Sequence, residues 1–239
     1  MSRELRSWRE IPALLLAGAG LLTVQILWHA KLAAPQSVAR PLPAAPPLPI
    51  ARSLAFGDPV TSSKLLMLWL QAFDTQAGHS LALHSLDYER VIAWLNLSLA
   101  LDPLAQYPLL AASRLYAEVP DPKRSRRMLE FVEKAFADDP AQRWPWLAHA
   151  VYLARHRLQD SALALRFAQA LAANPAPEIP HWARQLEIFV LEDRGEIEAA
   201  KILLGGLLAS GKIADPHERW FLSQRLHALE VERPPLRDP

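Results

Sequence analysis

Cysteine is absent from this 239-residue chain. Its absence excludes disulfide bonds, thiolate catalysis, iron–sulfur clusters, cysteine-ligated zinc and an acylated lipoprotein cysteine. An excess of charge of one sign is also nearly absent, because 26 Lys and Arg are balanced by 25 Asp and Glu, which gives a formal net charge of +1 at pH 7. A chain without a broad basic field has little with which to attract phosphates, so we expect no nucleic-acid partner.

Motifs for catalysis and cofactor binding are missing as well. Gly205-Gly206 lies inside an apolar run and has neither the lysine nor the spacing of a phosphate loop. Of the eight histidines, His149 and His156 are seven residues apart, too far for two ligands on one metal without a third element between them. Glu196 falls at an expected helix N-terminus, where the helix dipole favours an anion. We therefore predict no enzymatic activity, no cofactor and no metal.

No Asp, Glu, Lys or Arg occurs between Ile11 and Ala30, IPALLLAGAGLLTVQILWHA. This is about the twenty residues that a helix needs to cross a bilayer core of about 30 Å. Arg3, Arg6 and Arg9 precede the segment and favour a cytoplasmic N-terminus. The sequence predicts cytoplasmic residues 1–10, a transmembrane helix over 11–30, and export of everything after it to the periplasm of a bacterium.

A cleaved signal peptide is the alternative interpretation of this segment. Cleavage requires small residues three and one positions before the cut. Cuts after residues 30, 33 and 34 place Trp28, Lys31 and Leu32 at the first of these positions, and none of the three is small. We favour an uncleaved signal anchor in the inner membrane.

Proline dominates the segment that follows. Residues 33–50, AAPQSVARPLPAAPPLPI, contain six prolines and no glycine. In polyproline II conformation, at about 3.1 Å per residue, they would span on the order of 50 Å. We predict a stiff linker over residues 31–60 that tethers the next domain, with a Pro-rich ligand for a partner domain as the alternative.

From residue 61 to residue 231 the chain is predicted to be helical throughout. Ala/Leu-rich runs alternate with turn signals, and no sustained alternation of β-branched residues occurs. The expected pairs are 62–77 with 87–101, 105–119 with 123–137, 141–156 with 160–172, and 179–193 with 196–210. A closing helix over 217–230 is predicted to cap the array with a polar face formed by Arg219, Ser223, His227 and Glu230. Trp69, Trp94 and Trp220 are predicted in the core, and residues 232–239 form a disordered tail.

Three proline dipeptides recur along this helical region. Asp102-Pro103, Asp139-Pro140 and Asn174-Pro175 are 37 and 35 residues apart. A recurrence near 34 residues is typical of helix–turn–helix repeats that stack into a solenoid. The sequence therefore predicts an all-α solenoid of about four helix pairs plus a capping helix, preceded by the membrane helix and the Pro-rich linker.

The central repeat carries a recognisable set of large and small residues. Trp146 lies six residues after Pro140, and Ala150 occupies the small position of the same helix. The following helix supplies Ala162, Phe167 and Ala170, the last two one residue late. This pattern resembles the tetratricopeptide repeat (TPR) family. The resemblance implies that small residues let paired helices approach, and that the first helices line a concave groove for a segment of another protein.

The groove positions carried over from this resemblance are Tyr107, Arg114, Trp144 and Arg155. Aromatic residues and arginine are favoured at interface centres, although ordinary packing between repeats also accounts for Trp144. We predict a membrane-tethered scaffold that docks partner proteins in an extracytoplasmic envelope complex of the assembly, secretion or pilus type. The alternative is an accessory subunit of a larger integral-membrane enzyme or transporter complex.

The densest charge cluster is Lys123-Arg124-Ser125-Arg126-Arg127. It is interpreted as the solvated start of a helix, with an acidic partner or lipid headgroups as the alternative. A helix N-terminus favours anions, so the cations there call for a structural explanation.

Overall fold

The computed structural model describes residues 13–31, 41–73, 75–76, 79–80, 83–211 and 213–231. The chain divides into two units, residues 1–40 with 76–79 and residues 41–75 with 80–239. The smaller unit contains helix α1 (Ala13–Lys31), whose side chains are exposed from Leu15 to Ala30. No helix in the described ranges has both the length and the apolar character needed to cross a membrane. The predicted cytoplasmic segment 1–10 and the tail 232–239 lie outside the described residues.

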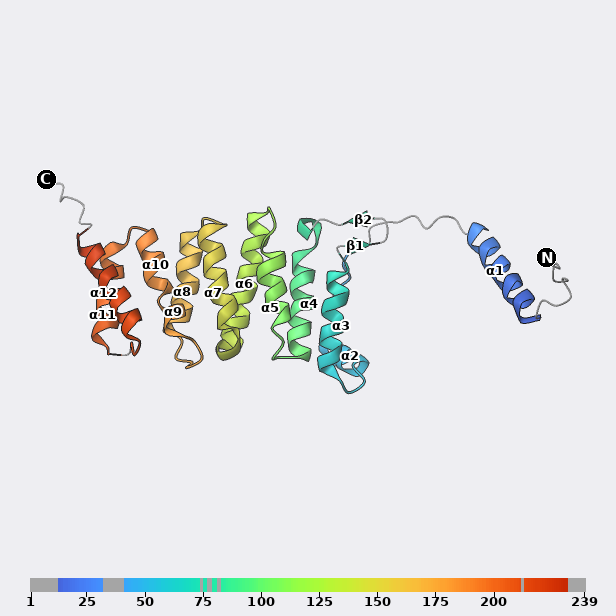
Figure 1. Ribbon diagram of the computed structural model, residues 1–239, viewed down its shortest axis with the longest axis horizontal. Helices are drawn as coiled ribbons and strands as arrows, with labels where there is room; N and C mark the ends of the chain where they lie inside the picture. Colours follow the sequence, from blue (N-terminus) through green and yellow to red (C-terminus); the bar gives the residue numbers. More distant parts are fainter. Residues whose placement is uncertain are drawn as a thin grey trace, which may run out of the picture. The chain divides into compact units, whose positions relative to one another are not determined.

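The larger unit is built almost entirely of helices (Figure 1). In chain order these are α2 (Leu48–Leu54), α3 (Pro59–Gln71), the 3-10 turn η2 (Leu83–Ser85), α4 (Tyr88–Leu101), α5 (Tyr107–Ala111), the π-helical segment η3 (Ala112–Tyr116), α6 (Pro122–Asp138), α7 (Pro140–His156), α8 (Ser161–Ala173), α9 (His181–Arg184), α10 (Leu186–Asp193), α11 (Ile197–Ala209) and α12 (Pro216–Val231). Two short strands, β1 (Thr75–Gln76) and β2 (His79–Ser80), pair with each other. The prediction of an all-α chain is confirmed.

Aspartate starts many of these helices. Five helices have an aspartate N-cap whose carboxylate accepts from a backbone N–H of the first turn: Asp58, Asp87, Asp121, Asp139 and Asp160. Proline follows three of these caps at the first helical position, where its missing N–H costs nothing and its fixed φ suits a helix. Asp139 ends α6 and caps α7, so these two helices are joined by a single residue.

Packing follows the order of the chain. From α3 onward each helix contacts its neighbour in sequence, as α6 contacts α7, α7 contacts α8, α10 contacts α11 and α11 contacts α12. Helices one pair apart also touch, as α4 touches α6 and α8 touches α10. The described helices thus pair as α3/α4, α5–η3/α6, α7/α8 and α9–α10/α11, with α12 last. This arrangement is consistent with a helical solenoid.

The segment predicted as a free linker is docked on the helices over its described second half. Leu42 is 2 % exposed and belongs to the main core. Arg90 Nη1 donates to the carbonyl of Leu42, and Trp94 Nε1 donates to the carbonyl of Pro43 at 2.9 Å. Residues 41–54, which we call the strap, therefore lie along α4.

The strap continues as a helix instead of an extended spacer. In α2, Ala51 is buried in a small apolar cluster with Leu97 and Leu101 of α4. Prolines lack a donor but keep their carbonyls, so a Pro-rich segment can accept hydrogen bonds from Arg90 and Trp94 without leaving donors unpaired. The ordered helical region accordingly begins before residue 61, the boundary that the sequence predicted.

Two predicted helices are interrupted, and two predicted core residues, Trp69 (39 % exposed) and Trp220, are exposed. The helix expected over 105–119 is α5 followed by the π segment, and that expected over 179–193 divides into α9 and α10 at Gln185. Gln185 is buried, and its amide donates to Glu218 Oε1 at 2.5 Å. The core prediction for Trp220 is wrong: its side chain is 65 % exposed, because it lies about 160° around α12 from buried Leu222.

The three arginines of the basic cluster at residues 123–127 form ion pairs within the chain. Arg127 forms a two-bond ion pair with Glu89 at 2.7 and 3.0 Å. Arg126 pairs with Asp160, and Arg124 pairs with the helix cap Asp121 at 3.2 Å. Two of these acids, Glu89 and Asp160, lie about one repeat away along the sequence. Their carboxylates offset the positive charge at this helix start, which accounts for the cations there. The alternative of an acidic partner has no support from these arginines.

Candidate protein-binding groove

Three hollows lie between successive first helices of the pairs in the described array. The first separates η3 from α7, the second separates α7 from α9–α10, and the third separates α9–α10 from α12. We name them the basic, aromatic and acidic hollows after the side chains that line them.

The basic hollow has a volume of about 410 Å³. Its lining consists of Arg114, Glu118, His149, Tyr152, Leu153, His156 and Arg157. The π-helical turn, marked by the bond from Ala117 N to Ala112 O at 2.9 Å, shapes the wall that carries Arg114. Such turns are frequent at functional sites.

Only part of the positive charge in this hollow is compensated. Arg157 Nη1 lies 3.8 Å from Glu118 Oε2, and its Nη2 donates to the backbone carbonyl of Glu118 at 2.5 Å. Arg114 is exposed and makes no ion pair or hydrogen bond with another residue of the described part. One guanidinium is therefore left for an outside anion.

His149 joins this hollow to the next. Burial lowers the pKa of the His149 imidazole first, and the nearby Arg114 guanidinium lowers it further, against an opposing effect of Glu118. Its Nε2 is buried and has no hydrogen-bond partner among the described residues. The ring stacks on Tyr152, with centroids 6.2 Å apart and an interplanar angle of 17°. The imidazole is thus a neutral aromatic surface near pH 7.

The aromatic hollow has a volume of about 390 Å³. It is lined by Trp144, Pro145, Ala148, His149, Tyr152, Trp182 and Leu186. Trp144 meets Trp182 edge to face, with ring centroids 5.5 Å apart at 74°. Tyr152 is 57 % and Trp182 54 % exposed. Large aromatic side chains left open around an apolar hollow are typical of a contact surface.

The acidic hollow has a volume of about 590 Å³. Its lining residues are Pro180, His181, Trp182, Gln185, Phe189, Asp215, Glu218 and Phe221. Asp215 accepts from the backbone N–H of His217 at 2.9 Å, and Glu218 accepts from Gln185. Neither carboxylate forms an ion pair with a Lys or Arg of the described part. Two anionic groups are therefore open to an outside cation.

Shared lining residues make the three hollows one continuous groove. The basic and aromatic hollows share His149 and Tyr152, and the aromatic and acidic hollows share Trp182. We call this surface the helix-A groove. Its charge changes from positive through apolar to negative in the order of the chain.

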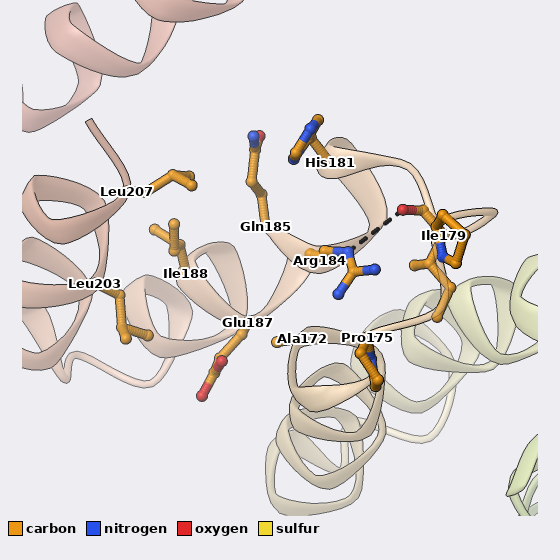
Figure 2. Close-up of a pocket in the computed structure, with 11 residues that line it drawn as sticks. Ala172, Pro175, Ile179, His181, Arg184, Gln185, Glu187, Ile188, Leu203 and Leu207 are labelled. Atoms are coloured by element: carbon orange, nitrogen blue, oxygen red, sulfur yellow. Dashed lines mark hydrogen bonds between the residues drawn. The ribbon is translucent and has the colours of Figure 1, made fainter. Parts of the chain in front are cut away.

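A fourth hollow, of about 660 Å³, lies on the side of α8 and α11 (Figure 2). Ile188, Leu203 and Leu207 form its apolar wall. Arg184 donates to the carbonyls of Ile179 at 3.3 Å and Ala176 at 2.6 Å. Its guanidinium is used to hold the loop between α8 and α9, so the polar side of this hollow supports the fold.

Two of the four predicted groove residues line the helix-A groove, and the other two do not. Arg114 and Trp144 line the helix-A groove. Tyr107 is partly exposed at the start of α5, where its hydroxyl accepts from Gln71. Arg155 forms an ion pair with Asp193 and lines none of the hollows described here.

Several groove residues were not found from the sequence. On α7, Pro145, His149, Tyr152 and His156 recur at intervals of three and four residues, which places them on one helix face. From that spacing this face of α7 could have been predicted from the sequence. Trp182 gave a weaker signal, because the helix break beside it is not visible in the sequence.

Both repeat-signature residues of α7 pack within the helical array. Ala150 is fully buried. Trp146 is partly buried, and its Nε1 donates to Gln106 Oε1 at 2.6 Å. This bond connects α7 to the turn before α5, which is the previous pair.

The signature residues of α8 differ from the predicted positions. Phe167 is fully buried and Ala170 partly buried, but Ala162 is exposed. Five residues before Phe167, Ala162 lies about 140° around the helix from it. Ala164 and Ala168 are the small residues that face the core on α8.

Comparison of the chain with models of known families, with curated proteins and with solved structures found no match.

Proposed function

We propose that this protein is a membrane-tethered, TPR-like scaffold whose helix-A groove docks a segment of another protein in an extracytoplasmic envelope complex. The observation that carries the proposal is the continuous groove with exposed Tyr152 and Trp182 at its centre. A row of hollows with open aromatics and unpaired charges suits a partner that brings apolar and charged side chains.

The anchor is proposed from the sequence of α1 and of the residues before it. α1 carries no charged side chain from Ala13 to Ala30, and the cationic residues before it favour a cytoplasmic N-terminus. On this proposal the helical array lies in the periplasm of a bacterium and α1 belongs to the inner membrane.

Photocrosslinking tests the docking function. A benzophenone amino acid is placed at Tyr152 in the groove or at exposed Gln169 on α8 as the matched control, in full-length protein expressed in membranes. We expect a discrete crosslinked species from position 152 that is lost when Trp182→Ala is added. Equal products from both positions, or none from position 152, would contradict docking in this groove.

A second candidate function is an accessory subunit of a larger integral-membrane complex. Gly18 and Gly20 of α1 have open space where a Cβ would stand, and small residues permit close contact between membrane helices. Replacing residues 11–30 by an unrelated transmembrane helix separates the two functions. A scaffold retains its crosslinks after the exchange, whereas a subunit held by α1 loses its complex.

A further inference from the structure

We infer that the helix-A groove selects a segment in polyproline II conformation with an acidic residue, a large apolar residue and a basic residue at successive three-residue intervals. The inference rests on the proposed docking function and names the chemistry of the partner.

The basic hollow selects the acidic residue. Arg157 is held by the carboxylate and the backbone carbonyl of Glu118, whereas Arg114 has no partner among the described residues. A guanidinium fork binds a carboxylate through charge-assisted, often bidentate hydrogen bonds. The partly buried, neutral His149 lines the same hollow as Arg114 and does not add a second competing charge.

The aromatic hollow selects the apolar residue. Trp144 and Trp182 form its edge-to-face wall, with Tyr152 stacked on His149 opposite. Aromatic rings fixed by each other present a rigid contact area that loses little side-chain freedom on binding. The lining contains no charged group, so a charged side chain would be desolvated there without a partner.

The acidic hollow selects the basic residue. Asp215 directly precedes α12, and Glu218 lies in its first turn. The carboxylates of both accept hydrogen bonds from neutral donors only. Phe221 and Trp182 form apolar walls along which the stem of a Lys or Arg can pack. The pair thus matches a cation at the opposite end from Arg114.

Helix packing sets the spacing of the three residues. Packed helices lie about 8–10 Å apart, and each hollow occupies the gap between one first helix and the next, where α7 contacts both η3 and α10. A polyproline II segment has three residues per turn and rises about 3.1 Å per residue, so side chains at i, i+3 and i+6 share one face about 9 Å apart. An α-helix would need about six residues for each step, at 1.5 Å per residue.

The strap of the chain itself does not fit this description. Residues 11–57 contain no Asp or Glu, and the described part of the strap is held by Arg90 and Trp94 of α4. The strap is therefore not the occupant, and we assign the groove to a segment of another protein with the charge order given above.

Two designed peptides test the charge order. Labelled Glu-Pro-Pro-Trp-Pro-Pro-Arg and the reversed sequence Arg-Pro-Pro-Trp-Pro-Pro-Glu are titrated with the full-length protein in mild detergent, and binding is followed by fluorescence anisotropy. On this inference the groove also fixes the direction of the bound chain, so we expect one peptide to bind about tenfold more tightly at low salt, the value of one charge-assisted contact. The preference is expected to weaken at high salt.

Charge-reversal variants assign the preference to the groove. Arg114→Glu combined with Asp215→Lys, at an exposed carboxylate that accepts only from the backbone N–H of His217, is expected to exchange the two peptides in order of affinity. Arg52→Glu, the same arginine reversal at an exposed position of α2, is the matched control and leaves the order unchanged. Each variant is first shown to keep the parental melting midpoint.

The outcomes separate this inference from the proposed function. Equal binding of both peptides, with loss of both in Trp182→Ala, overturns the charge order and leaves docking in the groove standing. Binding of neither peptide also overturns the inference, whereas the docking function is judged by the crosslinks from position 152. Exchange of the preference by Arg52→Glu would overturn the assignment to this groove.

Discussion

Truncation of Leu42 in the strap is the sharpest test of how the N-terminal part of the array is held. The side chain is 2 % exposed and belongs to the main core, although it lies among prolines in a segment whose composition predicts a free linker. A docked strap makes this leucine a core residue. A free tether makes it a solvated one.

The expected loss of stability follows from the burial of the Leu42 side chain. Removing a buried leucine side chain down to Ala costs about 2–5 kcal/mol in protein cores. Leu42 lies at the end of the array, where neighbours can relax into the space, so we expect about 2–3 kcal/mol. In a unit of this size 1 kcal/mol shifts the melting temperature by about 2–4 °C, and the expected loss is therefore about 4–12 °C.

The assay is thermal and urea unfolding of the full-length protein, followed by circular dichroism. Leu54→Ala in the same strap is the matched control, because its side chain is 64 % exposed and such a change is worth about 0.5 kcal/mol or less. Since a repeat array can open from its end, hydrogen exchange of the α4 amides is measured in parallel. Leu42→Ala behaving like Leu54→Ala in both measurements would refute the docked strap.

Three further predictions concern the central repeat. Ala150→Leu introduces a large side chain at a fully buried position and is expected to destabilise the fold by about 1–3 kcal/mol, whereas Ala209→Leu at the exposed end of α11 should change the urea midpoint little. Asp139→Ala removes the carboxylate that accepts from the first turn of α7 and should lower the free energy of unfolding by about 1 kcal/mol, measured in the same titration; no change would mean that water replaces the cap. The fold lowers the pKa of His149 from its ordinary value of 6.5, so the unfolded chain binds the proton more tightly, and the stability present above about pH 6.5 is lost as the pH falls. His149→Gln should flatten the melting temperature between pH 7.5 and pH 5, and His227→Gln on exposed α12 should leave the slope unchanged; equal slopes in all three proteins would contradict the assignment.

Much of the helical pattern was predictable because its signals are local. Helix ends at residues 101, 138 and 173 lie within a residue or two of the proline dipeptides, since proline disfavours continued helix by contact with its own chain neighbours. The paired helices α7 and α8 begin within a residue of the predicted starts, because Asp139 and Asp160 cap them directly.

The interruptions of the first helices were not predictable in the same way. Gln185 breaks a run that has good helix formers on both sides, and it does so while buried against Glu218 of α12. The π segment at Ala112–Tyr116 likewise occurs in an Ala/Leu-rich run without Gly or Pro. Both depend on contacts with other helices, which no local propensity records.

The sequence by itself determined where the helices begin and end, the recurrence of their pairs and the apolar character of the N-terminal segment, since each rests on interactions within a few residues. Only the tertiary structure decided that the strap docks on α4, that Ala164 and Ala168 face the core in place of Ala162, and that Arg114, Trp182 and Glu218 share one groove. Those facts depend on how far each helix is rotated about its axis and on which helix lies beside it. Burial of apolar surface across the whole array sets both.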